Sequence, residues 1–385
     1  MFLKTLHLRN FRNYIEQRVE FNAPKTILVG DNAQGKSNLL EAVGVLATLK
    51  SCRANRDREL IREGESVSQI TAYLTRISGS VELSLTLRNS SRRTLAVNGY
   101  TLRRQLDFLG ILKAVQFSSL DLDLVRGSPE VRRQWLDILL VQLEPIYAHI
   151  LHQYNQVLRQ RNALLKAIKT QKSIEGESFD IASKHSEIAI WDQQLASIGT
   201  RVIRRRARAL VRLTPIAQEW HSAIARQGEI LNIRYLPNVG SLLVSQLCDN
   251  PEQVECAFLE QIRQKALAEF HQGTTLVGPH RDEIEFTINQ VPARQYGSQG
   301  QQRTLVLALK LAELKLIEEV VGDSPLLLLD DVLAELDPKR QHQLLEAIQE
   351  RFQTLITTTN LGAFESSWLS KSQILSVKAG KIFSK

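Results

Sequence analysis

Residues 30–37 read GDNAQGKS, which fits the pattern G-x-x-x-x-G-K-[ST] of a phosphate-binding loop. Glycines at both ends of such a loop let the backbone curl, so that successive N–H groups point at phosphate oxygens. Lys36 is expected to reach the β- and γ-phosphates, and Ser37 to offer its hydroxyl to Mg²⁺. The pattern therefore predicts that ATP and Mg²⁺ bind here, with the nucleotide held by Gly30, Asp31, Asn32, Ala33, Gln34, Gly35, Lys36 and Ser37.

Two adjacent carboxylates stand far along the chain, directly after an apolar run. Residues 326–329 are all leucine, as expected for a strand that is buried on both faces of a parallel sheet. The carboxyl end of such a strand lies beside the ligand of an open α/β sheet. We expect Asp330 to hold Mg²⁺, directly or through water, and Asp331 to orient or deprotonate an attacking water. The structural alternative is a pair of ordinary surface acids.

A third motif, YGSQGQQR at 296–303, precedes an amphipathic pattern that predicts a helix over 304–320. Ser298, Gly300 and Gln301 would place a second anion-binding helix start in the same chain. One triphosphate does not need two such cradles. The order of motifs instead favours a head-to-tail dimer, in which these residues cap the γ-phosphate held by the phosphate loop of the other copy.

The elements that must position these motifs alternate between strand and helix periodicity. Strand patterns cover 3–8, 16–21, 26–29, 68–75, 81–87, 94–97 and 113–117, and they return at 283–288, 325–329, 355–359 and 374–377. Apolar residues between about 130 and 260 recur at helical spacing. The sequence thus predicts an α/β fold split by a helical insertion, with 1–129 and 261–385 forming the head and 130–260 the inserted domain.

Positive charge is concentrated just after the phosphate loop. The 385-residue chain has a formal net charge of +8, and 50–104 alone holds eleven basic and five acidic residues. Arginine-rich surface suits the phosphate backbone of DNA, whereas a solvated face with local ion pairs is the alternative. The candidate DNA-binding residues are Lys50, Arg53, Arg56, Arg58, Arg92, Arg93, Arg103 and Arg104. A second basic run on an expected helix comprises Arg201, Arg204, Arg205, Arg206, Arg208 and Arg212.

Composition narrows the class of protein. The chain is 43% hydrophobic, but it contains no run of about 18 apolar residues, so we expect no contact with a membrane. Its N-terminus alternates like a strand and does not resemble a signal peptide. The three cysteines form no C-x-x-C pair, and their odd number argues against a disulfide framework. These features predict a cytoplasmic protein.

Taken together, the motifs resemble the RecF family of bacterial recombination mediators, which are related to SMC-type ATPases. The resemblance runs nearly end to end and is carried by segments 8–14 (LRNFRNY), 30–42 (GDNAQGKSNLLEA), 50–53 (KSCR), 117–124, 127–129 with Arg132 and Arg133, 160–166 (QRNALLK), 278–282 (GPHRD), 297–303 (GSQGQQR) and 329–337 (LDDVLAELD). It implies a P-loop ATPase head of the ABC/SMC type.

The resemblance also implies a function. A member of this family would be an ATP-binding protein of DNA replication and repair that forms a homodimer with ATP. It would bind duplex, gapped or single-stranded DNA, and help RecO and RecR to load RecA, also in the SOS response. Two other interpretations share the motifs, namely a structural DNA clamp with a vestigial nucleotide site and, with less support, the motor subunit of an ABC transporter.

Individual roles follow from the resemblance position by position. Ala334, Glu335, Leu336 and Asp337 match a D-loop that faces the dimer partner. Many ABC ATPases have Glu where this chain has Asp331, and 357–360 (TTTN) replaces a switch histidine. These departures imply slow hydrolysis, with Lys36 and Asp331 as the catalytic pair and ATP acting mainly as a dimerisation switch. Gln116 is either a Mg²⁺-sensing residue or an ordinary strand-end amide. His280 and Arg281 either approach the nucleotide or form structural contacts.

Overall fold

The computed structural model describes residues 1–54, 56–77, 79–90, 92–175, 181–225, 228–240, 242–348, 351–362, 364 and 366–384, and at 172–175, 181–185, 335, 367 and 384 it describes the backbone alone. The chain forms two compact units. The first consists of Met1–Leu122, Ile216–Glu229 and Ser298–Lys385, and the second of Asp123–Pro215 and Ile230–Gly297. The phosphate loop and the acidic strand end therefore belong to the same unit, although they are far apart in the sequence.

One sheet of the first unit is antiparallel and has the strand order β2-β1-β4-β5-β6-β7. Its strands are β1 (Phe2–Phe11), β2 (Tyr14–Glu20), β4 (Val67–Arg76), β5 (Gly79–Arg88), β6 (Thr94–Val97) and β7 (Tyr100–Thr101). Buried and exposed side chains alternate along the long strands, because only one face of this sheet covers the core. Asn98 and Gly99 have positive φ values of 51° and 80°, as a two-residue hairpin turn requires.

The other sheet of the first unit carries the phosphate loop. Its order is β15-β14-β3-β13-β12-β8, and only β15 runs antiparallel to its neighbour. The strands are β3 (Lys25–Val29), β8 (Ala114–Ser118), β12 (Leu326–Asp330), β13 (Thr354–Thr358), β14 (Gln373–Lys378) and β15 (Lys381–Ser384). Leu28 and Leu328 of this sheet belong to one buried cluster with Leu39 and with Leu6 and Leu85 of the antiparallel sheet. Because β3, β13 and β12 are adjacent and parallel, their carboxyl ends lie at the same edge of the sheet.

Five helices are connected to this sheet along the chain. Helix α1 (Lys36–Thr48) follows β3, α9 (Gln299–Val321) precedes β12, α10 (Val332–Glu335) and α11 (Pro338–Ala347) lie between β12 and β13, and α12 (Ser366–Ser370) precedes β14. Helix α1 packs against β8, β12 and β13. Helix α9 is buried along most of its length rather than on one face, and its buried charged side chains Lys310 and Glu313 pair with each other at 3.3 Å.

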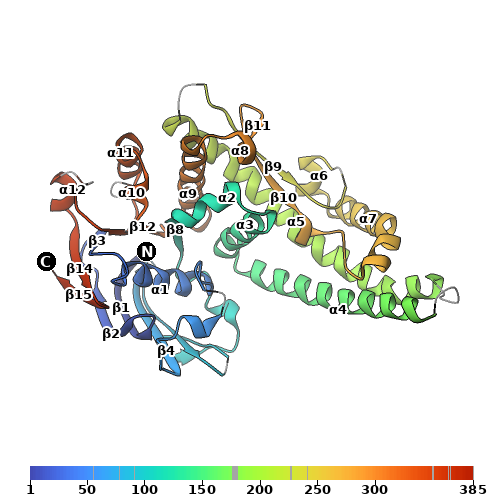
Figure 1. Cartoon of the computed structure of the whole chain (residues 1–385), viewed down its shortest axis with the longest axis horizontal. Helices are drawn as coiled ribbons and strands as arrows, with labels where there is room; N and C mark the ends of the chain where they lie inside the picture. The colour runs from blue at the N-terminus through green and yellow to red at the C-terminus, as the bar shows by residue number, and fades with distance from the viewer. Residues whose placement is uncertain are drawn as a thin grey trace. The chain divides into compact units, whose positions relative to one another are not determined.

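The second unit is mainly helical (Figure 1). Its helices are α2 (Asp123–Arg126), α3 (Pro129–Leu143), α4 (Ile146–Glu175), α5 (Ile181–Ile224, whose last residues belong to the first unit), α6 (Val244–Asp249), α7 (Pro251–Gln272) and α8 (Ala293–Tyr296). Leu165 of α4, Ile188 of α5 and Phe270 of α7 form a shared buried cluster. A small sheet, β11-β10-β9, completes the unit with β9 (Leu231–Leu236), β10 (Glu283–Ile288) and β11 (Val291–Pro292).

Buried ion pairs hold the second unit together. Arg161 is 1% exposed and donates to Glu269 at 2.6 Å and to Asp192 at 2.7 Å. Arg206, equally buried, contacts both oxygens of Asp137 at 3.0 Å and Asp282 at 3.0 Å. Each buried guanidinium is thus paired with two carboxylates, as a charge removed from water requires.

The α/β fold with a helical insertion is confirmed, and every expected strand is present within a few residues of its expected bounds. The second unit contains the expected insertion except for 216–229, and it also includes 123–129 and 261–297. The difference at 261–297 arises because α7 continues to Gln272 and β10 pairs with β9. In the part of the chain that the structure describes, no helix is both long and apolar enough to cross a bilayer.

Candidate nucleotide site

The phosphate loop is fixed by contacts from the turn between β1 and β2. Asn13 Nδ2 donates to Gln34 O at 3.0 Å, and Tyr14 OH donates to Gly35 O at 2.9 Å. Gly35 has φ +115°, and a Cβ there would lie 2.7 Å from Asn13 Nδ2. A Cβ on Gly30 would lie 2.3 Å from Val377 O. Both glycines of the motif are therefore required by local geometry, which leaves the loop as a concave backbone cradle.

Lys36 begins α1 and folds back over this loop. Its Nζ donates to Gly30 O at 2.7 Å and to Asp31 O at 2.9 Å, and the side chain is only 3% exposed. These carbonyls hold the ammonium at the concave side of the loop. The arrangement can present a positive charge to phosphate oxygens together with the N–H groups of the first turn of α1.

The two acids lie at the carboxyl end of β12, as the sequence predicts. Asp330 is paired in register with Thr357 of β13, whose Oγ1 donates to Asp330 Oδ1 at 2.9 Å. The same hydroxyl accepts a hydrogen bond from Asp331 N at 2.8 Å. Thr357 thereby orients the first carboxylate and fixes the backbone of the second.

Asp331 has a different environment from Asp330. Its φ of 54° is left-handed, a conformation that few residues other than glycine, asparagine and aspartate adopt readily. Burial raises the pKa of Asp331, the nearby Asp330 raises it further, and the charge of Lys36 opposes both effects. Strand β13 pairs with β3 at Thr358 and Val29 and with β12 at Thr357 and Asp330, so the phosphate loop and the two acids follow the carboxyl ends of strands on either side of β13.

Ser298 begins α9 with a capping box. Its Oγ accepts from Gln301 N at 3.2 Å, while its own N–H donates to Gln301 Oε1 at 2.9 Å. Gln301 Nε2 also donates to Glu229 Oε1 at 3.2 Å. Ser298 is exposed, and a Cβ on Gly300 would lie 3.4 Å from Arg340 Nη2, so this guanidinium lies beside the helix start. The reciprocal bonds hold a serine hydroxyl and free helix N–H groups at the surface, which suits an anion approaching from outside.

The segment 334–337 precedes α11, and Asp337 caps that helix by accepting from Arg340 N at 3.2 Å. Ala334 and Asp337 are exposed, whereas Leu336 is buried. For Glu335 the side chain lies outside the described residues. The exposed backbone and capping carboxylate suit a contact with a second copy, so the D-loop assignment stays a prediction.

Gln116 lies on β8, two residues before the strand end. Its Oε1 accepts a weak hydrogen bond from Cys52 Sγ at 3.6 Å, and its buried Nε2 has no partner among the described residues. A Cβ on Gly44 would lie 3.1 Å from Gln116 Oε1. Since Gly44 is seven residues beyond Ser37, at 1.5 Å per residue this amide lies about 10 Å along α1 from the loop. Its role as a Mg²⁺ ligand stays a prediction.

The eight basic candidates for DNA contact do not form a uniform group. Arg93 donates to both oxygens of Asp57, at 2.5 and 2.6 Å, and Arg104 is bonded to Asp107 at 2.9 Å. The bidentate pair with Asp57 favours a structural role for Arg93. The side chain of Arg104 is 74% exposed, and a surface pair of this kind does not take it out of the set of candidates. The other candidates also have exposed side chains, namely Lys50, Arg53, Arg56, Arg58, Arg92 and Arg103.

The second basic run is not a continuous charged surface. Arg206 is buried against Asp137 and Asp282, so the expectation that it belongs to a phosphate-binding face is wrong. Arg204 and Arg208 donate to Cys248 O at 3.0 Å each. Arginine periodicity on a helix cannot reveal these distant partners.

His280 and Arg281 make contacts within the second unit. His280 Nδ1 shares a hydrogen bond of 2.7 Å with Tyr154 OH, and Arg281 Nε donates to Thr275 O at 3.1 Å. Burial lowers the pKa of His280 to about 4, so its imidazole is neutral at physiological pH. These contacts favour the structural interpretation of both residues.

The functional contacts that sequence reasoning missed are those of Asn13, Tyr14, Thr357 and Arg340. The first two fall in the LRNFRNY segment, whose conspicuous polar and aromatic residues after an alternating strand are the available signal. Thr357 falls in the segment 357–360 noted above, but its contacts with Asp330 and Asp331 join residues that are distant in the sequence, as does the contact of Arg340 with Thr304, so no local pattern predicts them.

Comparisons with known proteins agree with this geometry. The family model described as "RecF/RecN/SMC N terminal domain" matches residues 2–381. The chain is 68% identical over 383 residues to the DNA replication and repair protein RecF of Nostoc punctiforme, with 99% of each chain covered. It is 65% identical over 382 residues to the RecF of Rippkaea orientalis, again with 99% of each covered.

A solved structure entitled "Structure of the recombination mediator protein RecF-ATP in RecFOR pathway" matches all of this chain and 97% of its own, with 30% identity and a TM-score of 0.89. The Smc head domain of Pyrococcus furiosus, at 17% identity and a TM-score of 0.54, shares the fold alone. The chain belongs to the RecF family of DNA replication and repair proteins, with the α/β head of the SMC-type ATPases.

Proposed function

We propose that this protein binds ATP in the loop 30–37, dimerises around it, and acts on DNA during replication and repair. The observation that carries the proposal is the strand register, which sets the loop 30–37 and the acids Asp330 and Asp331 at the carboxyl ends of β3 and β12, on either side of β13, with a backbone cradle whose glycines are required by local geometry. The solved relative named for its ATP complex supports the same ligand.

The residues fit a Mg²⁺–ATP complex. Magnesium is commonly held by one or two carboxylates together with substrate phosphates, and when bound it would neutralise charge on the β- and γ-phosphates. Asp330 and Ser37 would hold it, with Gln116 as a further candidate.

The exposed start of α9 supports the dimer. Ser298, Gly300 and Gln301 of one copy would cap the γ-phosphate held by the other, so ATP would favour the dimer by contacts absent from the monomer. A few charge-assisted hydrogen bonds at about 1.5–3 kcal/mol each shift assembly by orders of magnitude. Asp331 would position water for slow hydrolysis, and ATP would serve mainly as a dimerisation switch.

The partners are proposed on family grounds and on charge. The exposed cations of 50–104 would contact the DNA backbone at gaps or single/double-strand junctions, and RecO and RecR would join in loading RecA in the cytoplasm. The test is to measure mass by light scattering and DNA affinity with and without ATP, on duplex, gapped and single-stranded substrates. We expect ATP to double the mass and tighten salt-sensitive DNA binding. An unchanged mass would instead favour a DNA clamp with a vestigial nucleotide site.

A further inference from the structure

Strand β9 forms one edge of the small sheet of the second unit. Asn289 N donates to Ile230 O at 2.9 Å just before the strand begins. Because backbone pairing alternates along an antiparallel ladder, the even-numbered residues of β9 bond to β10, while Ile233 and Tyr235 direct their N–H and C=O groups away from it. Among the described residues, no hydrogen bond reaches these groups on the outer side.

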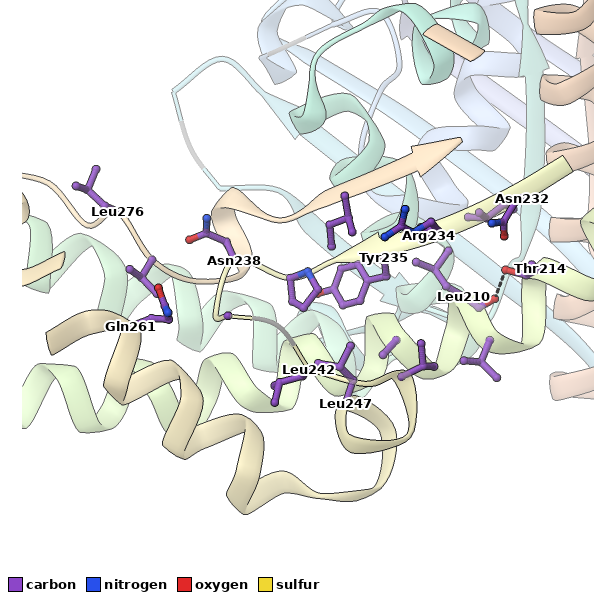
Figure 2. Close-up of a pocket in the computed structure, with 18 of the residues that line it drawn as sticks. Leu210, Thr214, Asn232, Arg234, Tyr235, Asn238, Leu242, Leu247, Gln261 and Leu276 are labelled. Carbon is purple, nitrogen blue, oxygen red and sulfur yellow. Dashed lines mark hydrogen bonds between the residues drawn. The ribbon is translucent and has the colours of Figure 1, made fainter. Parts of the chain in front are cut away.

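A pocket of about 800 Å³ lies along this edge. Its volume is in the range of about 300–1,000 Å³ that is typical of ligand sites. Figure 2 shows Tyr235 of β9 and Leu210 of α5 on two sides of the pocket, with Leu247 of α6 on a third. Two further lining side chains are exposed although apolar, since Val211 is 49% and Val244 59% exposed. The outward-directed backbone groups of β9 and exposed apolar side chains are thus accessible to a ligand in the same pocket.

The charge of the lining is one-sided. Arg234 and Lys265 are the charged side chains that line the pocket in the described part of the chain, and no carboxylate does. Lys265 is exposed. Arg234 forms an ion pair with Glu285 at 3.5 Å, and its side chain remains 61% exposed. The rim therefore attracts an acidic ligand, and it repels a basic one.

We propose that the β9 edge and its pocket bind an extended acidic peptide of a partner protein, which adds a fourth strand to the sheet. Ile233 and Tyr235 supply two donors and two acceptors for its backbone, as strand addition requires. Alternate residues of an extended peptide point to one side, so its apolar side chains enter the pocket at every second position. Its carboxylates lie against Arg234 and Lys265. The site is separate from the nucleotide loop and does not depend on the proposed function.

The test is a display selection of random nonapeptides on the full-length chain without nucleotide, followed by affinity measurements on the enriched peptides. We expect enriched sequences to alternate apolar residues with carboxylates. Lys265→Glu is expected to weaken their binding at least tenfold, since it reverses a charge at the rim. Arg263→Glu is the matched control, because it makes the same charge change on the same helix at a side chain that does not line the pocket. We expect it to change affinity less than twofold.

Two further measurements distinguish strand addition at β9 from nonspecific binding of apolar peptides. N-methylation of alternate backbone amides in an enriched peptide removes its donors, and we expect binding to be lost in one of the two alternating registers and kept in the other. Val244→Asp is expected to weaken binding with the fold intact, because Val244 is exposed. No enrichment, basic consensus sequences, or equal binding of both methylated registers would overturn the proposal. So would concentration-dependent self-association abolished by Val244→Asp, which would make a second copy the occupant.

Discussion

Arg340 Nε donates a hydrogen bond to Thr304 Oγ1 at 2.9 Å, which joins the segment after 334–337 to helix α9. The same guanidinium reaches Gly300 O at 3.3 Å and forms an ion pair with Asp337. One side chain therefore fixes the D-loop relative to Ser298, the two segments that would face the partner copy.

Replacing Arg340 by alanine should weaken ATP-dependent dimerisation while leaving ATP binding to the single copy unchanged. The two hydrogen bonds to α9, at about 1 kcal/mol each, set an upper limit of roughly thirtyfold on the rise in the dimer dissociation constant, because they act by holding the dimer-facing segments in place. Sedimentation with ATP measures the first quantity, and nucleotide anisotropy the second. Lys339→Ala, at an exposed neighbour, serves as the control. Equal dimer affinities for the two variants would exclude the coupling.

The Lys36→Met variant should lose ATP affinity. A hydrogen bond to a charged group is worth about 1.5–3 kcal/mol, so a loss of roughly ten- to a hundredfold is expected. Titration of a fluorescent ATP analogue provides the measurement. Lys378→Met, which removes an exposed lysine from β14, should bind ATP like the unmodified chain. If Lys36→Met binds ATP with unchanged affinity, the Lys36 side chain does not contact the nucleotide.

The contact between Gly35 and Asn13 can be tested by stability. Gly35→Ala places a Cβ 2.7 Å from Asn13 Nδ2 at φ +115°, whereas Gly322→Ala has φ +73° and open space around it. Both variants incur backbone strain, but only the first overpacks, which costs a further 1–3 kcal/mol or so. Urea unfolding should show that difference in the free energy of unfolding. Equal losses of unfolding free energy in the two variants would mean that the turn between β1 and β2 moves aside for the added methyl group without a measurable loss of stability.

The buried His280 should make stability depend on pH. Its pKa is lowered from 6.5 to about 4 in the folded chain, so the unfolded chain binds the proton first as pH falls. Stability contributed by the neutral imidazole is therefore complete above pH 7 and is lost between about pH 6.5 and 4, by roughly 2 kcal/mol at pH 5.

The His280→Gln variant removes this titration. The loss of unfolding free energy between pH 7 and pH 5 should be smaller in the variant than in the unmodified chain by that amount. Parallel pH profiles for the two proteins would show that His280 is accessible to protons in the folded state.

Local patterns were sufficient for most of the fold. Strand β6 has the expected bounds of 94–97, and the buried run of β12 was expected to within one residue, because alternation and continuous apolar runs are properties of neighbouring residues. Strand β9 was not predicted. Its residues lie within a region of helical periodicity, and the strand forms because β10, some fifty residues later, pairs with it.

The candidate site also contains features that local sequence predicts and contacts that only distant residues determine. The residue types of 30–37 and the acids after β12 indicate their chemistry, and the structure places both at the carboxyl ends of strands in one sheet. Arg93 and Arg206 carry the same charge as the surface arginines, yet Asp57 and Asp137 bind them internally. Sequence reveals that an arginine is present, but only the fold determines which carboxylate it meets.

The central claim is that two copies complete one nucleotide site, and a mixing experiment tests it most directly. Neither the Lys36→Met chain nor a Ser298→Arg chain should dimerise with ATP alone. Their mixture retains one intact loop and one intact α9 start, so light scattering should detect an ATP-dependent heterodimer. If the mixture stays monomeric while the unmodified chain dimerises, or if Ser298→Arg alone dimerises normally, the nucleotide is not shared between copies as proposed.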